Sequence, residues 1–218
     1  MKRAAFFDMD RTLLVTNSAV SYVRWQVRNG ESPRSELVKL ASWLTQYSLG
    51  VLDAEGLAQK VTAPYRGVRE SDLRAKVAKW VRDEVLATLS GRARSELDRC
   101  RSQGDVCVLL TSATPYAAEP VARAVGIDHV LCSRVEVRDG VLTGKHLAPL
   151  CYGHGKVEAA ERFAREHDID LDQSSFYTDS VSDLPMLERV ARPVAVNPDP
   201  RLYFTARTRG WPIHWWRE

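Results

Sequence analysis

The chain has 218 residues, which suffices for one α/β domain with a sizeable insertion and excludes anything larger. Its 31 basic and 28 acidic residues give a formal charge of +3 and are scattered along the sequence, so nucleic acid is not an expected partner. Four cysteines without paired spacing, and an N-terminal apolar run of only four residues, indicate a cytoplasmic protein with free thiols and no stable membrane insertion.

The first predicted strand, residues 4–7, leads directly into two carboxylates, Asp8 and Asp10. Side chains one residue apart face the same way on a continuing strand, and in a tight turn they can converge on one ligand. Two such charges repel each other unless a cation lies between them or one of them holds a proton. We therefore interpret Asp8 and Asp10 as a catalytic pair.

No strand pattern appears between Asn17 and about Leu89, where apolar residues recur at helical spacing and prolines separate the periodic stretches. The periodic residues are Val20, Val23, Val27, Leu37, Leu40, Ala41 and Leu44. We predict an all-helical cap subdomain over residues 17–89, inserted into a core made of residues 1–16 and 90–218. Such an insertion can act as a lid over a bound ligand, or it can have a packing role only.

After the insertion, apolar strands alternate with helices. Further strands are predicted at 106–110, around 176–177 and at 193–196, and helices at 115–125, 156–166 and 184–190. Residues 130–137 and 141–143 read as a hairpin, because Asp139-Gly140 is a strong two-residue turn signal. The alternation predicts a Rossmann-like, doubly wound parallel sheet of the α/β class.

Polar residues follow the predicted strands at the edge where an open α/β sheet binds its ligands. Ser112 and Thr114 follow the second of these strands, Asp179 and Asp183 follow the third, and Lys156 begins a helix behind a glycine-flanked loop. Clustered carboxylates favour a hard cation such as Mg²⁺, and Lys156 would add positive charge. A phosphorylated substrate suits that combination best.

Each of these residues also has a purely structural interpretation. Ser112 and Thr114 could cap the helix that starts at Pro115, and Asp179 and Asp183 could cap the one that starts at Leu184. A lone lysine such as Lys156 usually lies in solvent.

Four segments resemble, in order, the four motifs of the haloacid dehalogenase (HAD) superfamily. They are residues 6–13 (FFDMDRTL), residues 110–114 (LTSAT), Lys156 and residues 179–183 (DSVSD). The most similar branch is the type IB phosphatases, which include phosphoserine phosphatase and carry a helical cap between the first and second motifs. Four ordered motifs at sensible spacing are a strong signal, whereas two aspartates alone would be a weak one.

The resemblance implies a Mg²⁺-dependent phosphomonoesterase that acts through an aspartyl-phosphate. Asp8 would be the nucleophile, while Asp10 would protonate the leaving alcohol and then activate water. Mg²⁺ would be held by the carboxylate of Asp8, the backbone carbonyl of Asp10 and Asp179.

The remaining roles implied by the resemblance are supporting ones. Ser112 and Lys156 would bind the substrate phosphate, Asp183 would support Lys156 and the metal shell, and Thr12 would help orient the loop.

Two positions depart from the pattern. Phosphoserine phosphatases carry a glutamate nine residues past the nucleophile, where it meets the substrate ammonium, and Asn17 stands there in this chain, which disfavours phosphoserine. Arg11 occupies a place often filled by glycine or serine, and we expect its side chain to reach solvent.

We expect the substrate to be a small phosphorylated metabolite. Phosphoserine, histidinol phosphate and phosphatidylglycerophosphate all remain open, and the oligomeric state is not predicted. The alternative is a phospho-ligand sensor on the same fold that binds without turnover. We expect His154, on its glycine-flanked loop, to be incidental, and the tryptophan-rich segment 211–216 to be a packed tail and not a membrane anchor.

Overall fold

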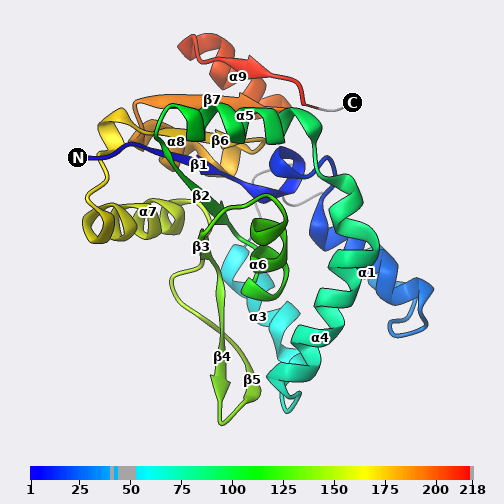
Figure 1. Cartoon of the computed structure of the whole chain (residues 1–218). Coiled ribbons are helices and arrows are strands. Elements are labelled where there is room, and N and C mark those ends of the chain that lie inside the picture. The colour runs from blue at the N-terminus through cyan, green and yellow to red at the C-terminus, as the bar shows by residue number, and fades with distance from the viewer. Residues whose placement is uncertain (40–41, 44–52, 217–218) are drawn as a thin grey trace.

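The computed structural model describes residues 1–39, 42–43 and 53–216. Its core is a six-stranded parallel sheet with strand order β3-β2-β1-β6-β7-β8, and β4 and β5 form a separate antiparallel pair (Figure 1). The strands are β1 (Ala4–Phe7), β2 (Val106–Thr111), β3 (His129–Cys132), β4 (Arg134–Arg138), β5 (Val141–Leu147), β6 (Ser175–Thr178), β7 (Arg192–Val196) and β8 (Ile213–His214).

Helices connect and cover these strands. The longer ones are α1 (Ser18–Arg28), α3 (Ala54–Thr62), α4 (Glu70–Trp80), α5 (Gly91–Ser102), α6 (Pro115–Ala124), α7 (His154–His167), α8 (Leu184–Arg189) and α9 (Pro200–Arg209). Short helical turns lie at Met9–Leu13, Ala63–Tyr65, Val81–Val85, Leu86–Thr88, Leu171–Gln173 and Val181–Asp183. Residues 35–39 and 42–43 are also helical.

The sheet is buried on both faces, which explains its continuous apolar strands. Along β1, Ala5 and Phe7 belong to the core cluster that also contains residues of α5 and α6, whereas Ala4 and Phe6 belong to the cluster that contains residues of α7, α8 and α9. All four of these side chains are fully buried. Burial of a phenylalanine side chain contributes about 1.5–3 kcal/mol, so this short strand anchors both layers.

The strand order reverses beside β1. The chain proceeds outward from β1 through β2 to β3, and then outward on the other side through β6, β7 and β8. In an open α/β sheet the crevice at the carboxyl ends of the strands on either side of such a reversal binds the ligand. The carboxyl ends of β1 and β6 are therefore where a ligand is expected. The predicted α/β class and doubly wound parallel sheet are confirmed.

The predicted hairpin needs a correction. Residues 129–132 are not part of it, because β3 pairs in parallel with β2 in the main sheet, and the hairpin begins at Arg134. The turn itself is as predicted: Asp139 and Gly140 both have positive φ, 50° and 74°, which a tight two-residue hairpin turn requires. The sequence pattern did not reveal α5, α9 or the short strand β8.

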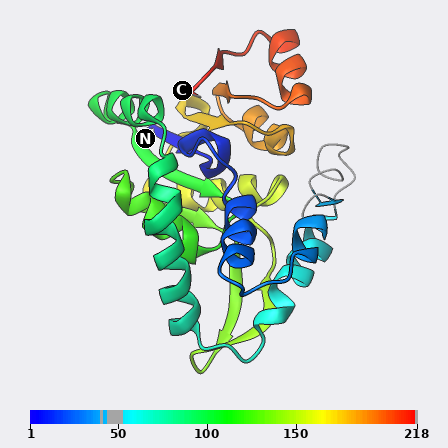
Figure 2. The same cartoon turned by 90° about the vertical axis from the view of Figure 1, so that its right-hand side faces the viewer.

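The described part of the insertion contains α1, α3 and α4, and the hairpin packs against it. The Gly67 backbone N–H donates to the carbonyl of Leu142, and the Leu142 N–H donates to the carbonyl of Val68. Figure 2 shows the hairpin and the three helices extending from the same side of the sheet. The limits 17–89 of the cap subdomain stay a prediction, and the expected helix positions Leu40, Ala41 and Leu44 lie outside the described residues.

Candidate active site

Two neighbouring parallel strands end in the predicted carboxylates. Asp8 directly follows β1 and Asp179 directly follows β6, and the Asp8 backbone N–H donates to the carbonyl of Tyr177 over 2.9 Å. Because β1 and β6 pair in parallel, their carboxyl ends meet at one edge, and both side chains line the same cavity of about 410 Å³. We call the cluster of Asp8, Asp10, Lys156, Asp179 and Asp183 around this cavity the catalytic end.

Lys156 lies between two of these carboxylates. Its Nζ is 2.7 Å from Asp8 Oδ1 and 2.7 Å from Asp183 Oδ2, and its side chain is only 3% exposed. The Asp183 carboxylate also accepts a hydrogen bond from Thr178 Oγ1 over 2.6 Å. The solvated interpretation of Lys156 is therefore wrong. Asp183 lies at the start of α8 without a side-chain capping bond, so the capping interpretation of Asp183 is wrong as well.

Asp10 has different partners, although only one residue separates it from Asp8. Its carboxylate accepts hydrogen bonds from the Ser18 backbone N–H over 2.9 Å and from Ser18 Oγ over 3.0 Å. Ser18 is the first residue of α1, so Asp10 is held at the positive end of a helix. The helical turn Met9–Leu13, which contains Asp10, has a left-handed residue, Arg11 at φ 55°, whose carbonyl accepts from Asn197 Nδ2 over 2.8 Å.

Burial and crowding disfavour full ionisation of this cluster. Burial raises the pKa of Asp8 to about 7, with Asp183 and Asp10 adding to the effect and the Lys156 ammonium opposing it. Burial also raises the pKa of Asp179 well above its ordinary value, and the charge of Asp8 raises it further. For Asp10, burial raises the pKa and the Ser18 hydrogen bonds lower it, with a net rise.

A divalent cation fits this donor set. The carboxylates of Asp8 and Asp179 and the backbone carbonyl of Asp10 are hard oxygen donors, and two carboxylates leave coordination positions for water and phosphate oxygens, as Mg²⁺ prefers. The carboxylate of Asp10 is engaged by Ser18, so it would take part through the main chain only. Among the described residues, no group of three or more His, Cys, Asp or Glu side chains is arranged to hold a metal ion.

Three hydroxyl residues and Arg11 complete the set of residues singled out in the sequence. Ser112 directly follows β2 and is an exposed residue on the wall of the cavity. Thr114 occupies the N-cap position of α6, but its side chain makes no capping hydrogen bond. Thr12 Oγ1 is buried with no hydrogen-bond partner in the described structure, so its orienting role stays a prediction. The Arg11 side chain is 37% exposed, yet its guanidinium lies 3.8 Å from Asp179, so it does not simply extend into solvent as expected.

The sequence analysis did not identify several supporting residues. Ser18 and Thr178 orient the carboxylates, Asn197 bonds the Arg11 carbonyl and the Trp216 N–H, and Asp199 accepts the Val181 N–H over 2.7 Å. Two of these residues had a local signal, since Asn17-Ser18 and Asp199-Pro200 are both typical of a helix start.

His154 lies outside the cavity lining, and the tryptophan-rich tail is packed at one of its two final tryptophans. His154 is exposed and is absent from the cavity lining, where His146 of β5 lies instead. Trp216 is 5% exposed and stacks on Tyr177 with ring centroids 5.8 Å apart, which confirms a packed tail at that residue, whereas Trp215 is 51% exposed. Among the described helices, none is long and apolar enough to cross a lipid bilayer.

Comparison with known proteins places this arrangement in a family. The profile of the haloacid dehalogenase-like hydrolases matches residues 5–188. Phosphoserine phosphatase SerB1 of Mycobacterium tuberculosis is 34% identical over 215 residues, which cover 96% of this chain and 70% of that protein. A histidinol-phosphatase of Neisseria meningitidis is 27% identical over 218 residues, which cover 98% of each chain.

The fold agrees with a solved structure. A phosphoserine phosphatase that carries an analogue of the phospho-aspartyl intermediate superposes with a TM-score of 0.74, covering 100% of this chain and 94% of that one at 19% identity. At this identity the likeness shows the fold alone.

The chain therefore belongs to the haloacid dehalogenase-like hydrolases. Within that family it is a phosphatase of the phosphoserine phosphatase-like group. The alcohol that its substrate carries does not follow from this membership.

Proposed function

We propose that the protein hydrolyses a phosphomonoester of a small metabolite through an aspartyl-phosphate on Asp8, with Mg²⁺ as its cofactor. The observation that carries this proposal is the different environment of two aspartates one residue apart. Asp8 faces the buried Lys156 ammonium, whereas Asp10 accepts two hydrogen bonds from Ser18. Carboxylates whose environments differ in this way suit a nucleophile and an acid–base group.

In the first step an Asp8 carboxylate oxygen attacks phosphorus, and the bond between phosphorus and the alcohol oxygen breaks. Asp10 donates its proton to that oxygen, and the alcohol leaves. In the second step water attacks the phosphorus of the acyl phosphate while Asp10 takes the water proton, so that phosphate leaves and Asp8 is restored. When bound, Mg²⁺ would neutralise charge on the phosphoryl oxygens.

Other residues would hold the phosphoryl group during both steps. Lys156 supplies a fixed positive charge beside Asp8, and Ser112 supplies a hydroxyl on the cavity wall. Ser112 also precedes α6, whose first backbone N–H groups are suited to binding an anion. Catalysis on this scheme rests on position and electrostatics, as in phosphoryl transfer generally.

The test is phosphate release from 4-nitrophenyl phosphate with Mg²⁺ by the wild type and by Asp8→Asn. Loss of a covalent nucleophile should lower kcat at least about 10³-fold. Asp98→Asn makes the same change at a 75% exposed side chain of α5 and should keep full activity. EDTA should abolish turnover and added Mg²⁺ should restore it.

Equal turnover by Asp8→Asn and the wild type would overturn the nucleophile assignment. If the folded wild type binds a phosphate analogue such as vanadate but releases no phosphate from any ester, the chain is a phospho-ligand sensor instead.

A further inference from the structure

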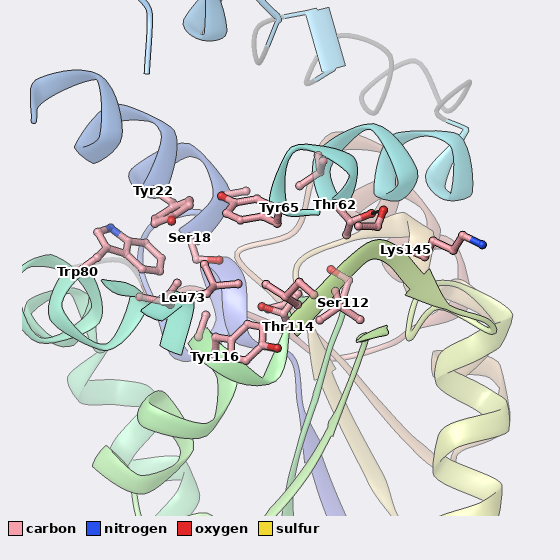
Figure 3. A pocket seen from close by; sticks show the side chains of 18 of the residues that line it. Ser18, Tyr22, Thr62, Tyr65, Leu73, Trp80, Ser112, Thr114, Tyr116 and Lys145 are labelled. Carbon is pink, nitrogen blue, oxygen red and sulfur yellow. Dashed lines mark hydrogen bonds between the residues drawn. The ribbon is translucent and has the colours of Figure 1, made fainter. Parts of the chain in front are cut away.

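A second cavity, of about 290 Å³, lies beside the catalytic end. Five large side chains dominate its wall: Tyr22 of α1, Tyr65 of the turn Ala63–Tyr65, Leu73 and Trp80 of α4, and Tyr116 of α6. Figure 3 shows Tyr22 and Tyr65 on one side of this space and Tyr116 on the opposite side. We call this cavity the aromatic chamber.

The aromatic chamber shares part of its wall with the cavity of about 410 Å³ at the catalytic end, which we call the catalytic cavity. Asp10, Ser112 and Thr114 line both. Under the proposed function, Asp10 protonates the alcohol oxygen as it leaves, so the alcohol must extend from the phosphate past Asp10. The aromatic chamber occupies that position.

Apart from the acids of the catalytic end, no carboxylate among the described lining residues of either cavity could pair with a substrate ammonium. These acids of the catalytic end are the only ones among the described lining residues. Residues 40–41 and 44–52 of the insertion lie outside the described structure, and their sequence contains no Asp or Glu. Asn17 lines the catalytic cavity, but its Oδ1 accepts the Val20 N–H over 3.0 Å and so caps α1. A buried ammonium without a counter-charge is strongly disfavoured.

The volume and shape of the aromatic chamber suit a ring. An apolar cavity of about 150 Å³ holds benzene, so this larger space can hold a ring with substituents. Its wall is well packed: Trp80 is 2% exposed, meets the Tyr22 ring edge-on at a centroid distance of 5.0 Å, and donates from Nε1 to Ser21 Oγ. Lys145 also lines it, but its amine points away from the rings in Figure 3.

We infer that the physiological substrate is the phosphomonoester of an uncharged, largely apolar alcohol that carries a ring or a group of similar volume, and that this group occupies the aromatic chamber. The inference rests on the proposed function and narrows it: amino alcohols such as serine are poor substrates. Apolar contact with Tyr65, Leu73 and Tyr116 selects the alcohol, while the catalytic end acts on the phosphate group that all these esters share.

The test compares three esters of primary alkyl alcohols that differ only in the substituent on the second carbon: ethyl phosphate, 2-phenylethyl phosphate and phosphoethanolamine. Burial of the phenyl ring should raise kcat/KM about 10- to 100-fold over ethyl phosphate, and the ammonium of phosphoethanolamine should lower it below ethyl phosphate. If no ester is hydrolysed, the proposed function fails. If all three are hydrolysed equally well, only the present inference fails.

Two variants and one control locate the selectivity. Tyr65→Ala should lower the ratio of kcat/KM for 2-phenylethyl phosphate to that for ethyl phosphate about 10-fold, whereas Tyr203→Ala, on α9 and outside both cavities, should leave the ratio unchanged. Asn17→Asp keeps the capping oxygen of α1 and adds a carboxylate, so it should raise the kcat/KM of phosphoethanolamine relative to ethyl phosphate.

Thermal unfolding establishes that each variant is folded. If Tyr65→Ala does not fold, the wild-type series and Asn17→Asp decide the question. A ratio that Tyr65→Ala leaves unchanged, or a wild type that prefers phosphoethanolamine, would overturn the inference.

Discussion

The catalytic end and the aromatic chamber lie side by side, yet they are built differently. At the catalytic end, charged side chains follow directly on strand ends or lie in the first turn of a helix, and short polar contacts such as the 2.7 Å pairs of Lys156 hold most of them. In the chamber, large and mainly apolar side chains come from three helices and a turn, and they are held mainly by packing. The first region can move charge and protons, whereas the second can select only by shape and apolar area.

This difference shows how a phosphatase can keep one reaction while its substrate varies. Substitutions in the chamber can change its volume and polarity while Asp8 and Lys156 stay the same. Substitutions in the two regions should therefore have separable effects: loss of turnover on every ester at the catalytic end, and changed preference in the chamber.

The largest effect is expected at Lys156. Lys156→Met leaves Asp8 and Asp183 buried without their shared cation, which should lower the free energy of unfolding by about 3–5 kcal/mol. Turnover of every ester should fall about 10³-fold, because a preorganised donor to the phosphoryl group is lost. Denaturant titration and steady-state kinetics measure both effects.

Lys145→Met is the matched control, since Lys145 is exposed at the edge of the chamber. It should change stability by less than about 0.5 kcal/mol. Comparable losses in the two variants would contradict the distinction between the regions.

A smaller and more selective effect is expected at Asp10. Asp10→Asn removes the general acid, so kcat/KM for an alkyl ester such as ethyl phosphate should fall about 10²–10⁴-fold. The fall should be at least about 10-fold smaller for 4-nitrophenyl phosphate, whose leaving group needs no proton. Ser18→Ala, which removes one of the two donors to Asp10, should show the same pattern more weakly. Equal losses on both esters would contradict the acid role.

The smallest of these effects concerns the support behind the catalytic end. Tyr177 of β6 stacks between Phe7, with ring centroids 4.5 Å apart, and Trp216. Trp216→Ala should lower the free energy of unfolding by about 3 kcal/mol without changing the ratio of kcat/KM values between esters. Trp215→Ala, at a 51% exposed side chain, should change stability by less than about 0.5 kcal/mol. A changed ester preference in Trp216→Ala would mean that the two regions are coupled.

The sequence predicted the strands that carry the site closely. The first predicted strand, residues 4–7, matches β1, and the strand predicted at 106–110 matches β2 to within one residue, because continuous apolar runs between polar stretches mark buried parallel strands. It misassigned residues 130–132, because β3 is a half-buried edge strand whose residues run almost directly into the hairpin. The helices α5 and α9 are strongly polar, and their few buried residues gave too weak a period to detect.

The sequence by itself determined the reaction class and predicted the edge of the sheet where the candidate site residues meet. Asp8, Asp179 and Ser112 each follow a buried strand directly, and parallel pairing brings consecutive strand ends together whatever lies between them. Only the tertiary structure decided that Ser18 holds Asp10 and that five large side chains enclose a space instead of filling it. A tyrosine or tryptophan at helical spacing looks the same in a sequence whether its face meets core or cavity, because the packing of the neighbouring helices and the hairpin sets that choice.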